Sequence, residues 1–310
     1  MKFTGRIRII VLAGIILSSN LFSQHSTVEK LSLVLRDDAR NNRKVPVDIY
    51  FPSVTGEDSS DVSSNPQSKL PVICFGHGYL ISGIWYRHIV DMIVPEGFIL
   101  IFPGSEAGLF PSHKTLAKDM DFALDQISRL GNETSSALYG LADTVKCLMG
   151  HSMGGGSMFL AANLNKEAKA AVALSPFDTR PSAIKAASSV KIPVLIFSGS
   201  NDCITPSGKH HLPIYNSLGS ELKTYILIKG GTHCQMGVSH PKCSAGEKIA
   251  GCREGISQEE QLRILAKYIV PWLKYHLKGD TDAGVQFNSF IGQDSGIEYI
   301  QSRILPVECK

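Results

Sequence analysis

The sequence lacks a concentration of positive charge and any apolar segment suited to span a membrane. Its 31 Lys and Arg residues nearly balance 28 Asp and Glu residues, giving a formal net charge of +3. No basic stripe with interleaved aromatic residues occurs, so we expect no nucleic-acid partner. The apolar run Ile9–Leu17 is too short to cross a bilayer comfortably.

That short apolar run has the features of an export signal. Basic residues (Lys2, Arg6 and Arg8) precede it, and a polar break and Ser23 follow. We predict a signal peptide at 1–23, leaving a mature chain of 24–310 with a formal charge of zero. No cysteine lies near the cleavage point, which argues against a lipid-anchored form. A secreted or periplasmic protein without a stable membrane anchor is expected; an uncleaved N-terminal anchor is the alternative.

Internal repeats and a second-domain boundary are also absent, and strands alternate with helices instead. Continuous apolar runs such as 98–102 indicate strands buried on both faces, as in a parallel sheet covered by helices. The expected strands are 31–35, 45–51, 72–76, 98–102, 144–149, 170–174, 193–198 and 223–228, and the expected helices 115–129, 153–163, 208–218 and 257–276. The first two strands form an antiparallel hairpin, and 54–68 is a Ser-rich loop. This order predicts one α/β domain with a mostly parallel open sheet.

A large lid is missing as well. Only about 18 residues separate the strand ending at Leu174 from the one starting near Ile192. An inserted helical lid needs far more chain, so we expect an open site.

One motif stands out among the residues that are present. Gly150-His151-Ser152-Met153-Gly154 is G-x-S-x-G, placed where a strand gives way to a helix. Such a turn holds the serine hydroxyl at the end of the strand, and glycines are needed where side chains would collide. The pattern predicts a nucleophilic Ser152; an ordinary turn is the alternative.

A serine nucleophile needs a base and an acid, and each has a candidate just past a strand. Asp202 follows the strand 193–198, and His233 follows the strand 223–228. The order Ser, Asp, His is that of a nucleophile-elbow hydrolase. A turn-forming aspartate and a structural histidine are the alternatives. The competing histidines are less well placed: His77, His151, His210 and His211.

Two backbone N–H groups are expected to stabilise an oxyanion. Met153 follows the nucleophile, and Tyr79 lies in the glycine-containing turn after the strand 72–76. A plain turn at the end of that strand is the alternative.

These motifs give the chain a resemblance to a known family. From Pro71 to about His276 it resembles α/β-hydrolases of the cutinase-like polyester hydrolase, dienelactone hydrolase and platelet-activating-factor acetylhydrolase group, nearest to bacterial poly(ethylene terephthalate) hydrolases. The resemblance rests on five motifs: Gly76-His77-Gly78-Tyr79, Gly150 to Gly156, Ser175-Pro176-Phe177, Gly199 to Asp202 with Leu212-Pro213-Ile214-Tyr215, and Gly230 to His233. The resemblance implies the triad Ser152, Asp202 and His233, an oxyanion hole from Tyr79 and Met153, and no cofactor. It also implies a substrate-binding role for Phe177, where polyester hydrolases usually carry a tryptophan; a core aromatic is the alternative.

Seven cysteines in an exported chain are expected to be partly oxidised. Cys74 and Cys147 lie in apolar strands and are expected to be buried thiols. Cys203 and Cys234 follow the proposed acid and base, so we predict a disulfide between them. Further alternatives involve the remaining cysteines: a Cys243–Cys252 pair, replacement of either partner by Cys309, or a zinc site with His240.

The predicted function is therefore a monomeric serine esterase that hydrolyses carboxylic esters, without metal or cofactor. A lactone, thioester or phospholipid acetyl ester is an alternative substrate. A non-catalytic binding protein on the same fold is the alternative from another class.

Overall fold

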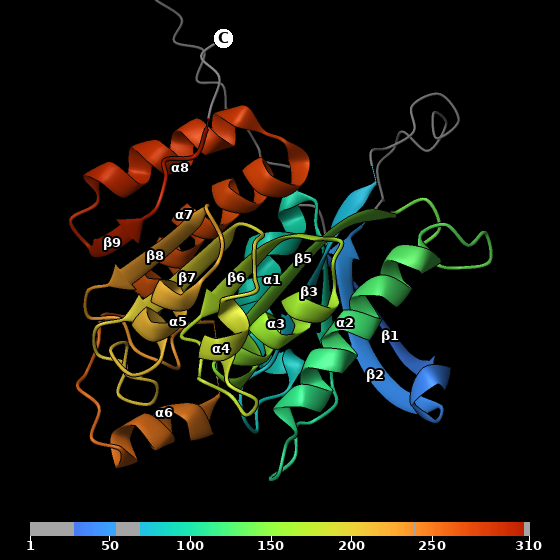
Figure 1. Ribbon diagram of the computed structural model, residues 1–310, viewed down its shortest axis with the longest axis horizontal. Helices are drawn as coiled ribbons and strands as arrows, with labels where there is room; N and C mark the ends of the chain where they lie inside the picture. The colour runs from blue at the N-terminus through green and yellow to red at the C-terminus, as the bar shows by residue number, and fades with distance from the viewer. Residues whose placement is uncertain (1–27, 54–68, 238–239, 307–310) are drawn as a thin grey trace, which may run out of the picture.

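A computed structural model describes residues 28–53, 69–237 and 240–306 (Figure 1). Its strands form one sheet in the order β1-β2-β4-β3-β5-β6-β7-β8-β9. Their bounds are β1 (Val28–Asp37), β2 (Arg43–Pro52), β3 (Leu70–Gly76), β4 (Ile99–Pro103), β5 (Ala142–His151), β6 (Ala168–Leu174), β7 (Val194–Gly199), β8 (Lys223–Ile228) and β9 (Ile297–Gln301).

The centre of the sheet is parallel and its two edges are antiparallel. Strands β4, β3, β5, β6, β7 and β8 run in one direction. Strands β1 and β2 form the predicted antiparallel hairpin at one edge, where β2 pairs antiparallel with β4. At the other edge β9 pairs antiparallel with β8, which the sequence did not predict. All the parallel strands therefore present their carboxyl ends at one edge, where sites in open α/β sheets form.

Helices cover both faces of this sheet, which confirms the predicted α/β-hydrolase architecture (Figure 1). One face carries α2 (His113–Leu130), α3 (Met153–Leu164), α4 (Ala183–Ala187) and α5 (His211–Ser217). The other carries α1 (Arg87–Ile93), α7 (Gln258–Lys278) and α8 (Thr281–Gln293). Helix α6 (Pro241–Ile249) has no buried residue, and short 3-10 turns occupy Asp38–Arg40, Gly83–Tyr86 and Val94–Glu96.

The alternation of side chains across the sheet divides the core in two. In β3, Ile73 and Phe75 face the α7 side, whereas Val72 and Cys74 face the α2 side, and all four are fully buried. A strand covered on both faces needs apolar residues at every position, which explains the continuous apolar runs. Cys74 and Cys147 are buried free thiols, as predicted.

The segment between β6 and β7 contains only the short helix α4, so no large lid is inserted at that place, as predicted. No helix in the described ranges is both long and apolar enough to cross a membrane. The predicted signal peptide, the Ser-rich loop 54–68 and Cys309 lie outside the described residues.

Candidate active site

Ser152 occupies a strained turn between β5 and α3. Its φ of 54° and ψ of −118° are unusual for a residue other than glycine, and such a conformation costs about 1–3 kcal/mol. The surrounding backbone holds it there. Its N–H donates to the carbonyl of Leu174 at 2.9 Å, and its carbonyl accepts from Gly156 at 3.0 Å and Phe177 at 2.9 Å. The backbone of Ser152 is therefore held by the end of β6, by the loop after β6 and by the first turn of α3.

Glycines beside Ser152 permit close approach of two backbone segments. A Cβ on Gly154 would lie 2.1 Å from the carbonyl carbon of Gly76, at the end of β3. A Cβ on Gly150 would lie 2.5 Å from the carbonyl oxygen of Gly154. Real Cβ atoms do not come that close, so these positions exclude any side chain. The start of α3 consequently packs directly on the loop that carries Tyr79.

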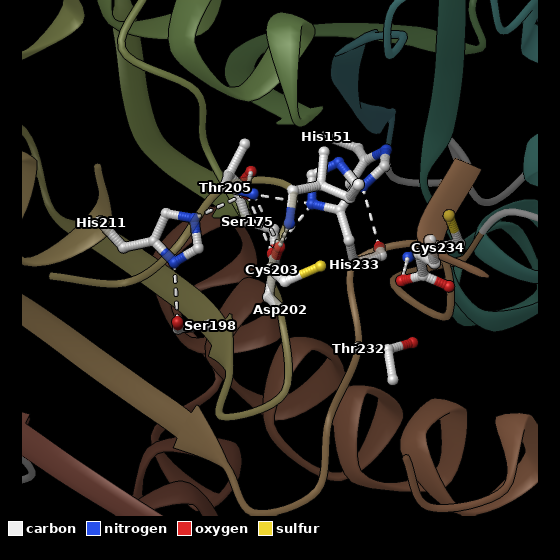
Figure 2. A network of polar contacts seen from close by, with 12 residues as sticks. His151, Ser175, Ser198, Asp202, Cys203, Thr205, His211, Thr232, His233 and Cys234 are labelled. Atoms are coloured by element: carbon white, nitrogen blue, oxygen red, sulfur yellow. Dashed lines mark hydrogen bonds and ion pairs between the residues drawn. The ribbon is translucent and has the colours of Figure 1, made fainter. Parts of the chain in front are cut away.

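Asp202 and His233 meet at the same edge of the sheet. Asp202 follows β7 and His233 follows β8, and His233 Nδ1 lies 2.8 Å from Asp202 Oδ2 (Figure 2). Only 5% of Asp202 and 3% of His233 is exposed. Since the carboxylate can only accept, Nδ1 carries the proton and Nε2 is left as the free basic nitrogen.

The Asp202 carboxylate is surrounded by donors. Its Oδ1 accepts from the backbone N–H groups of Ile204 at 3.0 Å and Thr205 at 2.8 Å. Burial alone would raise the pKa of Asp202, but the charge and hydrogen bond of His233, together with the Thr205 amide, outweigh it and lower the pKa below its ordinary 3.8. Asp202 is therefore ionised throughout the physiological range.

The acid and base loops are bound to one another and to α7. Asn201 donates its N–H to the carbonyl of Gly231 at 2.9 Å. The side-chain amide of Gln261 brackets Thr232: its oxygen accepts the N–H and its nitrogen donates to the carbonyl, both at 2.9 Å. This fixes the residue immediately before His233 and hence the direction of the imidazole.

His151 connects Ser152 to the base loop. Its ring lies 4.7 Å from the ring of His233, measured between centroids, and its Nε2 lies 3.1 Å from the His233 carbonyl oxygen. That oxygen can only accept, so Nε2 carries the proton and Nδ1 accepts from the hydroxyl of Tyr86 at 2.9 Å. Burial, followed by the charge of His233, lowers the pKa of His151 well below 6.5 and keeps it neutral. The residue before the serine therefore touches the proposed base.

The two predicted oxyanion donors lie on the segments that the glycines bring together. Met153 is the first residue of α3, so its N–H is one of those that a helix leaves without an intrahelical acceptor. Gly78, which precedes Tyr79, donates its N–H to the Tyr86 hydroxyl at 2.8 Å. Because Tyr86 also donates to His151, this loop is tied to the strand end that carries Ser152. The loop that carries Tyr79 is thus connected to the serine turn, and the roles of Tyr79 and Met153 as oxyanion donors stay predictions.

Phe177 lies next to the serine through its backbone and is half-buried. Its ring contacts two histidines, His210 at 5.0 Å and His113 at 6.2 Å between centroids. The structure thus brings this predicted substrate-binding residue to the candidate site.

The predicted Cys203–Cys234 disulfide is wrong. Cys203 pairs with Cys252, and Cys234 pairs with Cys243, with Cα atoms 5.3 and 5.7 Å apart. The acid and base loops are adjacent as expected, but Cys203 and Cys234 lie apart, with His233 between them (Figure 2). The partners come from residues 240–252, the segment that contains α6: Cys243 lies in the helix and Cys252 just after it.

The same pairing overturns the three alternatives for the later cysteines, since Cys243 and Cys252 are also not available to Cys309. Cys243 and Cys252 do not pair with each other. Because each is held in a disulfide, neither offers a thiolate to a zinc ion with His240.

The sequence did not predict three residues of the site. Tyr86 and Thr205 were not considered, and His211 was considered only as a competing base, not as a partner of Thr205. Thr205 was detectable in principle, because an aspartate whose carboxylate accepts from the N–H groups two and three residues later is a common turn. Tyr86 and His211 carry no local signal, since their roles depend on contacts with distant parts of the chain.

With this geometry in hand, comparisons with known proteins identify the family. The sequence matches the PETase family, described as PET hydrolase-like, over residues 63–297. Cutinase 2 of Thermobifida cellulosilytica is 30% identical over 193 residues, 62% of each chain. Cutinase cut1 of Thermobifida fusca is 30% identical over 193 residues, 62% of this chain and 51% of its own length.

A relative named for a terephthalate ester is also similar. The bis(hydroxyethyl) terephthalate hydrolase of Streptomyces coelicolor is 27% identical over 174 residues, 53% of this chain and 48% of its own length. The chain thus spans between about half and 62% of the length of these curated relatives. The match over residues 63–297 confirms the resemblance drawn from the motifs: this chain belongs to the PET hydrolase-like family.

Proposed function

We propose that this chain is an exported carboxylic-ester hydrolase that uses Ser152 as nucleophile, His233 as general base and Asp202 as the orienting acid. One observation carries the proposal: the buried 2.8 Å hydrogen bond from His233 to Asp202, beside a serine held in a strained strand-to-helix turn. The chain order and the position of each residue past a parallel strand support the same assignment.

In the acylation half of the reaction, the Ser152 hydroxyl oxygen attacks the ester carbonyl carbon. His233 Nε2 takes the hydroxyl proton as the bond forms, and Asp202 stabilises the resulting imidazolium. The tetrahedral intermediate collapses, the bond to the leaving alkoxide breaks, and the imidazolium gives its proton to that alkoxide. The products are a free alcohol and an acyl-enzyme ester on Ser152.

In the deacylation half, water attacks the acyl carbon while His233 again accepts a proton. Collapse of the second intermediate releases the carboxylic acid and returns the proton to Ser152. The N–H groups of Met153 and Tyr79 stabilise the oxyanion in both intermediates; one such donor is worth about 10²–10³ in kcat in serine hydrolases. Every proton is carried by residues of this chain, so the reaction needs no cofactor.

For the substrate we propose esters of bulky acids, including aromatic diesters and polyesters. The family match and the names of the relatives, cutinases and a bis(hydroxyethyl) terephthalate hydrolase, support this class. Phe177, beside Ser152, offers an aromatic face for an aromatic acyl group. The short connection between β6 and β7 leaves no large lid to restrict access.

Export fits the same proposal. Two disulfides flank the acid and base loops, and structural disulfides persist in oxidising compartments. The predicted signal peptide at 1–23 would deliver the chain to one.

The test uses purified protein and its Ser152→Ala variant. The wild type should hydrolyse p-nitrophenyl butyrate and bis(2-hydroxyethyl) terephthalate and react with a fluorophosphonate probe, which labels only an activated serine. The variant should fold normally and do none of these. Turnover retained in Ser152→Ala, or a wild type that neither turns over esters nor takes up the probe, would overturn the proposal. Rates on lactones, thioesters, phospholipid acetyl esters and polyester films then identify the substrate class.

A further inference from the structure

A second chain of buried polar side chains reaches Asp202, in addition to His233 (Figure 2). Ser198 in β7 contacts His211, the first residue of α5: the distance from Oγ to Nδ1 is 2.7 Å. His211 Nε2 lies 3.0 Å from the hydroxyl oxygen of Thr205. That hydroxyl lies 2.9 Å from Asp202 Oδ2. Ser198 and His211 are fully buried and Thr205 is 1% exposed.

The neighbours of Thr205 decide which way its proton points. Its hydroxyl carries one proton and faces two groups that only accept, Asp202 Oδ2 and the carbonyl of Ser175 at 3.3 Å. The shorter contact is to the charged carboxylate, which forms the stronger bond. The Thr205 oxygen then accepts from its two other partners: the protonated Nδ1 of His233, which lies 3.0 Å away, and Nε2 of His211, which must therefore donate.

The rest of the chain follows from this assignment. With its proton on Nε2, neutral His211 accepts at Nδ1 from the hydroxyl of Ser198. Burial lowers the pKa of His211 to about 3, so the ring is neutral at working pH. Each buried hydrogen-bonding group along the chain has a partner, and the direction of donation is fixed: Ser198 to His211 to Thr205 to Asp202.

This chain ends on the same carboxylate oxygen that binds the base. Asp202 Oδ2 accepts from Thr205 and from His233 Nδ1. A second donor on that oxygen partly neutralises the negative charge of the carboxylate. Asp202 therefore stabilises the imidazolium form of His233 less strongly. It also keeps the carboxylate from rotating away from the imidazole.

We propose that Ser198, His211 and Thr205 are positioning residues that present a fixed hydroxyl donor to Asp202 and thereby set the lowest pH at which His233 acts as a base. The proposal rests on the function proposed above. Other titratable groups near the pair are His151 beside His233, His210 beside His211, and Tyr225, which lies next to Ser198 from β8. None of these donates to Asp202 Oδ2, so Thr205 is the group to change.

The decisive experiment compares Thr205→Val with Thr205→Ser. Valine keeps the shape and removes the hydroxyl, whereas serine keeps the hydroxyl. The acid limb of the pH profile of kcat/KM for p-nitrophenyl butyrate should move up by about half to one pH unit in Thr205→Val and stay near its wild-type position in Thr205→Ser. Thr179→Val is the matched control, because Thr179 is also buried and donates its hydroxyl to a carbonyl, that of Pro181. Thr179→Val should not shift the acid limb of the pH profile of kcat/KM.

A second pair of variants tests the link to His211. Glutamine can place an N–H near the former Nε2, whereas leucine cannot donate. His211→Leu should shift the profile in the same direction as Thr205→Val, because the Thr205 hydroxyl is then free to turn to Ser175. His211→Gln should restore the wild-type position. This pair keeps the test decisive if Thr205→Val fails to fold.

The outcomes separate this proposal from the one it rests on. An active Thr205→Val or His211→Leu enzyme with an unmoved acid limb would overturn the positioning role, even if its melting temperature falls. A wild type that does not take up the fluorophosphonate probe would instead overturn the proposed function. Equal shifts in Thr205→Val and Thr179→Val would also overturn the positioning role, since they would indicate a general effect of losing a buried hydroxyl.

Discussion

Two buried aspartates in this protein are held in opposite ways. Asp119 in α2 is fully buried and is bound by two arginines: Arg40 Nη1 donates to Oδ1 at 2.6 Å and Arg43 Nη2 to Oδ2 at 2.7 Å. Asp202 is almost as buried, but its donors are backbone amides, the Thr205 hydroxyl and one imidazole. Both carboxylates are well satisfied, yet only one has a partner that can change its charge.

The difference separates a structural ion cluster from a reactive one. An arginine stays protonated at any pH at which the protein is folded, and the hydrogen bond with Asp119 raises the pKa of Arg43 further. The charge of Asp119 is thus permanently neutralised and joins the β1–β2 hairpin to α2. Asp202 keeps a negative charge without a permanent cation, so it can stabilise an imidazolium when His233 becomes protonated.

The largest expected effect is on catalysis at Asp202. In Asp202→Asn the backbone N–H groups of Ile204 and Thr205 still find an acceptor, so the protein should unfold cooperatively. His233 loses its orienting charge, and kcat should fall by about 10³–10⁴-fold, measured with p-nitrophenyl butyrate. A loss of less than tenfold would assign the acid to another residue.

The matched change at Asp119 should affect stability instead. In Asp119→Asn the half-buried guanidinium groups of Arg40 and Arg43 keep Asp37 and Glu106 as charged partners but lose the buried carboxylate that they share. The free energy of unfolding should fall by about 3–5 kcal/mol, measured by urea denaturation, while fluorophosphonate labelling of the folded protein persists. If Asp119→Asn abolished labelling without lowering stability, the contrast between the two aspartates would fail.

Buried His211 should make a defined contribution to the loss of stability in acid. The pKa of buried His211, about 3, lies below its value of about 6.5 in the unfolded chain. The unfolded chain therefore binds the proton first, and stability is lost as the pH falls from 6.5 towards 3. Between pH 7.5 and 5 this loss amounts to about 2 kcal/mol, and His211→Gln should remove it in urea titrations at the two pH values. An equal loss in variant and wild type would contradict the neutral, buried histidine.

The smallest expected effect concerns substrate choice. Phe177→Ala should raise KM for bis(2-hydroxyethyl) terephthalate about 2- to 10-fold, in line with the worth of an aromatic pair. KM and kcat for p-nitrophenyl acetate should not change, because its acyl group has no ring to stack. Phe177→Trp should restore KM for the aromatic diester. Equal effects of Phe177→Ala on both esters would show that the ring only supports the turn at Ser152.

The sequence predicted the central sheet and the loops after β5, β7 and β8 because their signals are local. A strand buried on both faces is a continuous apolar run, and Asp202 and His233 each follow one directly. Strand β9 and helix α8 were missed, since their patterns are mixed: β9 exposes three of its five residues, so it does not read as a buried strand.

Contacts between segments that are far apart along the chain could not be predicted from the sequence. The disulfide prediction failed because it inferred a pair from the proximity of two loops, without the position of α6. His211 was set aside as one residue of a helical pattern, yet the turn between Asp202 and α5 brings it back behind Thr205. Such contacts depend on where a whole helix lies, which no short spacing encodes.

Helix α6 has no buried residue of its own, yet both disulfides run to its segment. Covalent bonds therefore do for this helix what apolar packing does for the others. The choice of production host thus becomes a structural variable. In a reducing cytoplasm the two disulfides would not form, and α6 would lose its disulfide links to the rest of the domain. Cys203 and Cys234, which are directly bonded to Asp202 and His233 along the chain, would then be unpaired.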